Sequence, residues 1–174
     1  RVPGDDVVAE AGACLAAALA AAGHEVVGCD QSTVAVAAVA SNKPRAEPGL
    51  NDLLAPLVGT PRLQLTATLD AAVKQSEMTF VVVPTPSTPY GSFDASAVHD
   101  VTRQVSTATV GEHTLVIVST VSPGTTGRIA SFFESERFSI MYAPTFIALG
   151  SVLDGLRHPD FRLVAELHNG LLAE

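Results

Sequence analysis

The hydrophobic positions of the chain alternate between short unbroken runs and longer stretches in which they recur at helical spacing. The short runs are rich in β-branched residues and are followed at once by polar or turn-forming residues, as is typical of strands buried in a parallel sheet. Strands that alternate with helices predict an α/β fold with a doubly wound, mainly parallel sheet and helices on both faces. The pattern predicts strands at His24–Cys29, Arg62–Thr66, Thr79–Val83, Leu115–Val118, Phe138–Tyr142 and Phe161–Ala165, and helices at 7–22, 31–40, 51–58, 70–75, 94–108, 125–134, 147–156 and from 167 onward.

Polar residues stand directly after three of the predicted strands. Asp30 ends the first strand, the turn Pro84–Pro86 follows the third, and Ser119 and Thr120 follow the fourth. Ligands of open α/β sheets bind outside the carboxyl ends of the strands, so these residues are candidates for a binding crevice. The alternative is a set of ordinary turns, because Ser, Thr, Pro and Gly are common turn residues.

The composition indicates a single folded domain. The 174 residues fit one domain, and a hydrophobic content of 47% is enough for a packed core. The net charge of −8 and the pI near 5.0 argue against binding to nucleic acid or to an anionic membrane surface. No apolar run reaches the roughly 18 residues of a membrane span and no signal peptide is visible, so we expect a cytoplasmic protein.

The cysteines and histidines give no sign of a metal site. Cys14 and Cys29 do not form a Cys-x-x-Cys motif, and we expect both to be buried and reduced. Neither suits a catalytic thiolate, because a reactive thiol needs a polar and partly exposed setting. No two histidines have metal-ligand spacing, and we expect solvated or capping roles for His24, His99, His113, His158 and His168.

Six sequence stretches follow one another along the chain. They are GHEVVGCD at Gly23–Asp30, EPGLNDLL at Glu47–Leu54, VVVPTP at Val81–Pro86, GSFD at Gly91–Asp94, STVSPGTT at Ser119–Thr126 and YAPTFIALGS at Tyr142–Ser151. Together these stretches resemble the nucleotide-binding half of the UDP-glucose/GDP-mannose dehydrogenase family. The resemblance covers roughly residues 12–165, and the combination of VPTP with STVSPGTT is its most specific part.

The resemblance implies a Rossmann-like fold, NAD as the cofactor, and a two-step oxidation of the C6 alcohol of a nucleotide sugar to a uronic acid. It also implies a UDP- or GDP-linked substrate, a homo-oligomeric complete enzyme and a role in polysaccharide biosynthesis. Asp30 would hold the adenosine ribose, and Thr120 would lie beside the nicotinamide or the catalytic water. The implied cofactor-binding residues are Gly12, Asp30, Pro84, Thr85, Pro86, Ser119 and Thr120.

On the substrate side the resemblance implies contacts from Glu47, Thr145 and Phe146, and it implies Thr120 and Thr145 as catalytic residues. The family commonly has Asn and Glu at the positions of Ala143 and Thr145, and the glutamate helps to activate water. A threonine hydroxyl cannot act as a base near pH 7, so Thr145 can position a water but cannot deprotonate it. The chain therefore resembles a branch with different substrate chemistry.

The glycine-rich phosphate loop of the family is degenerate or missing. Of the three glycines of GxGxxG only Gly12 is present, and Val7 and Ala9 stand at the other two positions. A side chain there obstructs the approach of the pyrophosphate. Arg1–Asp6 is too short and polar for the strand that precedes this loop, and its aspartates would repel a phosphate. Either cofactor binding has been lost, or residues upstream of Arg1 have been cut away or altered.

We therefore expect residues 1–174 to form one dinucleotide-binding domain, without the central helix and the substrate-binding C-terminal domain of the family. The family nucleophile is a cysteine of the second half, so this stretch alone is expected not to complete the oxidation. One alternative is a non-catalytic relative that acts as a regulatory or assembly module. Another is a dehydrogenase of the 3-hydroxyacid type, against which the VPTP and EPGL stretches count.

Overall fold

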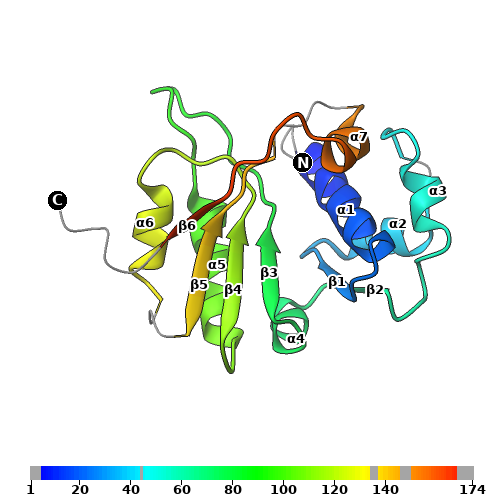
Figure 1. Cartoon of the computed structure of the whole chain (residues 1–174), viewed down its shortest axis with the longest axis horizontal. Coiled ribbons are helices and arrows are strands. Elements are labelled where there is room, and N and C mark those ends of the chain that lie inside the picture. Colours follow the sequence, from blue (N-terminus) through cyan, green and yellow to red (C-terminus); the bar gives the residue numbers. More distant parts are fainter. Residues whose placement is uncertain (1–4, 44, 134–136, 146–149, 168–174) are drawn as a thin grey trace. The chain divides into compact units, whose positions relative to one another are not determined.

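The computed structural model describes residues 5–43, 45–133, 137–145 and 150–167 (Figure 1). Within them the elements follow the order α1-β1-α2-α3-β2-α4-β3-α5-β4-α6-β5-α7-β6. The chain divides into two compact units, one of residues 1–72 and 146–161 and one of residues 73–145 and 162–174, which we call the first and the second unit. In the described part of the chain, no helix is both long enough and apolar enough to cross a membrane.

The first unit contains a two-stranded parallel sheet and several helices. Its strands pair so that Val26 lies opposite Leu63. Helix α1 is followed by Gly23, whose φ of +105° lies in the left-handed region that glycine adopts without a steric penalty. The elements are α1 (Asp5–Ala21), β1 (Val26–Cys29), α2 (Thr33–Ala40), α3 (Leu50–Leu54), β2 (Leu63–Thr66) and α7 (Val152–Arg157), and α4 (Leu69–Lys74) begins in this unit.

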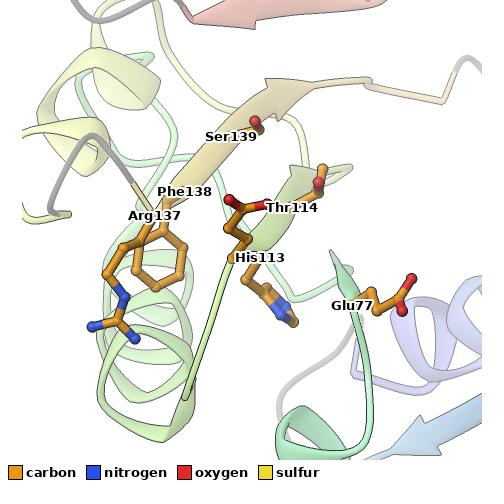
Figure 2. Close-up of a pocket in the computed structure, with 7 residues that line it drawn as sticks. Glu77, His113, Thr114, Arg137, Phe138 and Ser139 are labelled. Atoms are coloured by element: carbon orange, nitrogen blue, oxygen red, sulfur yellow. The ribbon is translucent and has the colours of Figure 1, made fainter.

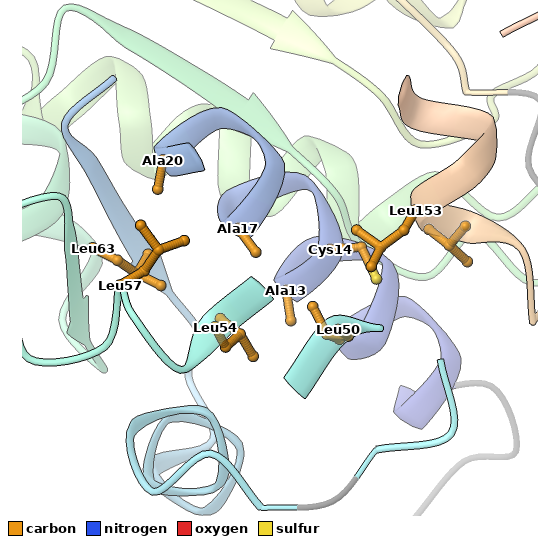
Figure 3. Packing of buried hydrophobic residues seen from close by; sticks show 10 residues of the cluster. Ala13, Cys14, Ala17, Ala20, Leu50, Leu54, Leu57, Leu63 and Leu153 are labelled. Atoms are coloured by element: carbon orange, nitrogen blue, oxygen red, sulfur yellow. The ribbon is translucent and has the colours of Figure 1, made fainter. Parts of the chain in front are cut away.

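Small side chains on one face of α1 form one side of the core of the first unit (Figure 3). They recur every three or four residues, the spacing at which side chains share a helix face. Their partners are larger aliphatic side chains from α3, the segment after it, β2 and α7. The buried cluster consists of Ala13, Cys14, Ala17, Ala20, Leu50, Leu54, Leu57, Leu63, Val152 and Leu153.

The second unit contains a four-stranded sheet in the order β3-β4-β5-β6. Strands β3 (Met78–Val81), β4 (His113–Ile117) and β5 (Phe138–Tyr142) are parallel, and β6 (Ala165–Leu167) is antiparallel to β5. Helix α5 (Ser96–Ala108) contacts β3, and α6 (Thr125–Ala130) contacts β5 and β6. Strand β4 is deeply buried because it lies between two other strands.

The Rossmann-like α/β class and the mainly parallel strand pairing are confirmed. The described strands form one sheet in each unit, with β1 paired to β2 in the first unit and β3 paired to β4 in the second. The last strand lies at Ala165–Leu167 rather than Phe161–Ala165, in register with Tyr142 of β5, so Leu167 does not begin a helix. The rest of that predicted helix, and residues 147–149 of the one before it, lie outside the described residues.

Strand β3 was expected to be a buried strand, and this is wrong for Phe80. Met78 is 44% exposed and Phe80 is 37% exposed, whereas Val81 is only 2% exposed. The reason is that β3 is the edge strand of the four-stranded sheet. An apolar run predicts a strand equally well at the centre and at the edge of a sheet. Which of the two it occupies depends on pairing with residues that are distant in the chain.

Candidate functional site

The carboxyl ends of β3, β4 and β5 lie at one edge of the sheet in the second unit, because the three strands are parallel neighbours. Backbone pairing continues past the strand ends, where Ala143 N donates to Ile117 O at 2.9 Å. This edge therefore collects the predicted residues Thr85, Thr120 and Thr145 from three separate segments. The segments that follow the strands are Val82–Pro86, Val118–Gly124 and Ala143–Thr145.

The predicted residues at this edge differ in their exposure. Thr120 and Pro86 are exposed, and Pro84, Thr85 and Thr145 are half-buried. Hydroxyl groups are thus available after each of the three strands, but no carboxylate lies at 143–145. The predicted substrate residue at position 146 lies outside the described residues.

Ser119, predicted among the cofactor-binding residues, turns its hydroxyl into the protein. The residue is only 8% exposed. Its Oγ accepts a hydrogen bond from Val83 N at 2.8 Å and donates one to Val83 O at 2.9 Å. The hydroxyl is therefore engaged with the backbone at the end of β3.

The loop between β3 and α5 is held by bonds to both neighbouring segments. Asp94 N donates to Pro86 O at 2.9 Å, and Phe93 N donates to Ser122 Oγ at 3.2 Å. Asp94 Oδ1 in turn accepts a hydrogen bond from Ser96 N at 2.9 Å, at the first residue of α5. The hydroxyl and the amide of Ser96 together lower the pKa of the Asp94 carboxyl. The polar turn after β3 thus continues into an ordered loop.

In the first unit, Asp30 directly follows β1 and is oriented by a turn. Its Oδ1 accepts a hydrogen bond from Ser32 N at 2.7 Å, and its own N donates to Thr66 O at 3.3 Å. Ser32 caps α2 by accepting from Ala35 N at 3.3 Å. The turn places a carboxylate at the carboxyl end of β1, where dinucleotide folds carry the acidic residue that binds the adenosine ribose.

Gly12 lies within α1 and not in a loop. The helix begins at Asp5, so positions 7–12 are helical. From Ala9 onward the helical N–H groups bond to carbonyls four residues earlier and are not available to a phosphate. A Cβ added at Gly12 would meet no atom within 4 Å, so packing does not require glycine there. The described residues therefore form no pyrophosphate cradle at this helix.

Glu47, predicted on the substrate side, joins three segments of the first unit. The residue is 4% exposed. Its Oε1 accepts a hydrogen bond from Leu153 N at 3.0 Å at the start of α7, and its own N donates to Glu10 Oε1 at 2.7 Å. Sequence reasoning missed this role because Glu47 and Leu153 are 106 positions apart.

An open depression lies at the opposite end of the sheet in the second unit, where β3, β4 and β5 begin (Figure 2). Sequence reasoning assigned nothing to this end, because its residues come from three separate segments with no shared motif. The depression has a volume of about 320 Å³ and is lined by Glu77, Glu112, His113, Thr114, Arg137, Phe138 and Ser139.

His113, expected to be solvated or capping, is buried with 4% exposed. Its Nε2 lies 2.8 Å from Thr79 Oγ1, and the ring also bonds to the backbone of Ser76. Burial lowers the pKa of His113, and the bond to Ser76 opposes part of this effect. The ring is therefore held in its neutral form at pH 7.

We expect His113 to make the folded protein less stable as the pH falls below about 6.5, the ordinary pKa of histidine. Because the pKa is lowered in the folded state, the unfolded chain takes up the proton first, and the free energy of unfolding falls toward acid pH. The free energy of unfolding, measured with urea between about pH 5 and 7, should depend less steeply on pH in His113→Gln than in the wild type. The exposed His24 offers a control for the substitution itself, since His24→Gln removes no buried imidazole. The same pH dependence of the unfolding free energy in His113→Gln and wild type would contradict this account.

The two cysteines are free, but only one is buried. Burial, reinforced by the charges of Glu47 and Glu10, raises the pKa of the Cys14 thiol to about 12. Cys29 was expected to be buried and is exposed at the end of β1, which among the described strands pairs with β2. Its partial burial and the neighbouring Asp30 still raise the pKa of its thiol. Within the described residues, no three His, Cys, Asp or Glu side chains are grouped as metal ligands.

A disulfide reagent such as DTNB should modify Cys29 in the native protein and reach Cys14 only after unfolding. Cys14 is fully buried, and its raised pKa keeps the thiol protonated, so the reagent meets no reactive thiolate there. Thiol titration before and after denaturation, with Cys29→Ser as the control, measures this difference. Two rapidly reacting thiols in the native protein would show that Cys14 is not buried as described.

Comparison with known proteins identifies relatives over nearly the whole chain. The sequence profile of the UDP-glucose/GDP-mannose dehydrogenase family, NAD binding domain, matches residues 10–168. GDP-mannose 6-dehydrogenase of Pseudomonas aeruginosa is 38% identical over 168 residues, which cover 90% of this chain and 38% of that protein.

Solved structures agree with this match. A ternary complex of GDP-mannose dehydrogenase from Pseudomonas aeruginosa superposes with a TM-score of 0.81 at 31% identity, over 90% of this chain and 38% of that one. A UDP-glucose dehydrogenase from the archaeon Pyrobaculum islandicum also gives 0.81 at 31% identity, over 88% and 38% of the two chains. The chain thus spans well under half the length of the relatives that it matches.

Proposed function

Because the chain belongs to the UDP-glucose/GDP-mannose dehydrogenase family and spans its NAD-binding domain, we propose that it is the cofactor-binding part of a nucleotide-sugar 6-dehydrogenase. The complete enzyme would oxidise a UDP- or GDP-linked sugar to the uronic acid. We further propose that it is a homo-oligomer that works in the cytoplasm, in polysaccharide biosynthesis. The observation that carries the proposal is the polar edge after three parallel strands, in a chain that the family profile matches over residues 10–168.

At the edge of the second unit, the half-buried Thr85 follows β3 and the exposed Thr120 follows β4. We assign both to the nicotinamide side of the cofactor, and the prolines Pro84 and Pro86 restrict the turn that carries Thr85. NAD, when bound, accepts the hydride that leaves the alcohol carbon. Thr145 follows β5, where its hydroxyl can hold a water in place without taking a proton from it.

In the first unit, we assign Asp30 to the adenosine ribose. The amide of Ser32 holds one carboxylate oxygen at 2.7 Å and so orients the group. A carboxylate accepts hydrogen bonds from ribose hydroxyls and repels the 2′-phosphate of NADP, which favours NAD. We keep Glu47 and Phe146 on the substrate side as proposals, whereas Gly12 lies inside α1 and is not proposed as a pyrophosphate contact. Because the helical stretch around Gly12 does not fit a pyrophosphate, we expect NAD to bind weakly.

A second candidate function is that of a non-catalytic module that keeps the fold. Two observations favour it: residues 7–12 are helical where the family has its phosphate loop, and Thr145 stands where the family commonly has a carboxylate. The 3-hydroxyacid alternative is set aside by the family match.

Calorimetric titration of NAD into the purified chain separates these two functions. We expect saturable binding that Asp30→Ala weakens about tenfold or more, because a hydrogen bond to a charged group contributes about 1.5 to 3 kcal/mol. The exposed Asp52 on α3 provides the control, and Asp52→Ala should bind as wild type does. No binding at millimolar NAD by a folded protein would favour the module.

A further inference from the structure

One serine side chain bonds both backbone groups of the residue that precedes the Pro84–Pro86 turn. Ser119 Oγ accepts from Val83 N at 2.8 Å and donates to Val83 O at 2.9 Å, with Val81 O a longer alternative at 3.3 Å. The backbone N of Ser119 also donates to Val81 O at 3.2 Å. Because Ser119 is only 8% exposed, water has little access to replace these bonds.

The Ser119 hydroxyl supplies hydrogen bonds to Val83 just beyond the end of the backbone ladder between β3 and β4. The paired register of the two strands ends with Val81 opposite Ile117. Pro84 has no N–H to donate, so the strand cannot extend in the usual way. Val83 is half-buried, and its N–H and C=O need partners. A hydroxyl donates and accepts at once and can therefore satisfy both groups.

Ser119 also stands between two proposed cofactor contacts. Thr120 is the next residue, and Thr85 lies two residues after Val83. We infer that Ser119 is a positioning residue, whose hydroxyl holds the Pro84–Pro86 turn against the end of β4 and so fixes the spacing of the Thr85 and Thr120 hydroxyls. The effect on cofactor binding rests on the function proposed above. In this role Ser119 acts through the backbone and does not itself touch NAD.

Three variants separate this role from a general loss of stability. Ser119→Ala removes the hydroxyl and leaves the Val83 groups without their partner, whereas Ser119→Thr keeps the hydroxyl. Thr102→Ala is the matched control in the same unit. Thr102 is 1% exposed and its Oγ1 donates to His99 O at 3.1 Å within α5, so this variant also loses a buried hydroxyl bond, but not at the carboxyl edge of the sheet.

Amide hydrogen exchange tests the anchoring without any cofactor. The Val83 amide should exchange about tenfold faster in Ser119→Ala, since its hydrogen bond is lost, while the Ile117 amide of β4 keeps its rate. Ser119→Thr should keep the slow exchange of Val83. Unchanged protection of Val83 in a folded Ser119→Ala variant would overturn the inference.

Titration with NAD tests the consequence for binding. The Kd for NAD should rise about tenfold in Ser119→Ala and stay near the wild-type value in Ser119→Thr, whereas Thr102→Ala should lower the Tm and leave the Kd unchanged. A wild-type Kd in Ser119→Ala, together with lost Val83 protection, would overturn the positioning role. A wild-type chain that does not bind NAD would instead overturn the proposed function, and the exchange data alone would then decide whether Ser119 anchors the turn.

Discussion

Replacing Leu54 by alanine is expected to lower the free energy of unfolding by about 3 to 5 kcal/mol, because it leaves a cavity in the core of the first unit. Leu54 lies on α3 with 0% exposed and packs in the cluster around α1. Urea unfolding followed by circular dichroism measures the loss.

The neighbouring Leu53 provides the control for this change. It lies on the same helix and is only partly buried against the cluster, so Leu53→Ala should cost about 1 to 2 kcal/mol. Equal losses for the two variants would show that the packing of α3 against α1 is not as described.

Replacing Glu47 by alanine is expected to cost about 2 to 3 kcal/mol of unfolding free energy. The change removes a charged acceptor and leaves the Leu153 amide at the start of α7 without its partner. An unpaired buried donor costs more than the bond itself contributes, because it has also lost its water. Thermal and urea unfolding measure the effect.

Glu47→Gln is the matched variant, because the side chain keeps an oxygen that can accept from Leu153 N at 3.0 Å. Glu47→Gln should lower the free energy of unfolding by less than about 1.5 kcal/mol, which is what the charge adds to the hydrogen bond. If Glu47→Ala proves as stable as wild type, the carboxylate does not hold α7.

The sequence predicted the separate elements well because their signals are local. The helical spacing of small residues in α1, the glycine after it, the apolar run of β4 and the alternating pattern of β2 each lie within a single segment. The pairing of the strands was harder to predict from the sequence. Whether a run such as that of β3 is central or an edge depends on residues that are distant in the chain, as does the exposure of Cys29 at the end of β1.

The residue types at the candidate site were readable from the sequence, but their local roles were not. Thr85 and Thr120 follow strands, as the motifs indicated, with Thr120 exposed and Thr85 half-buried. Ser119 and Glu47 belong to equally recognisable motifs, yet their polar atoms bond to backbone groups 36 and 106 positions away. A motif identifies a candidate residue, but only the three-dimensional contacts show whether its side chain faces a ligand or the protein interior.

Hydrogen exchange of the wild-type chain with and without saturating NAD tests the central claim most directly. The account predicts slower exchange in the bound state at the carboxyl ends of β3 and β4, in the segments 82–86 and 118–122. It predicts no change at the amino ends of the same strands, around the depression that includes His113 and Phe138. Binding that protects the amino ends, or that leaves segments 82–86 and 118–122 unchanged, would contradict a cofactor site at the polar edge.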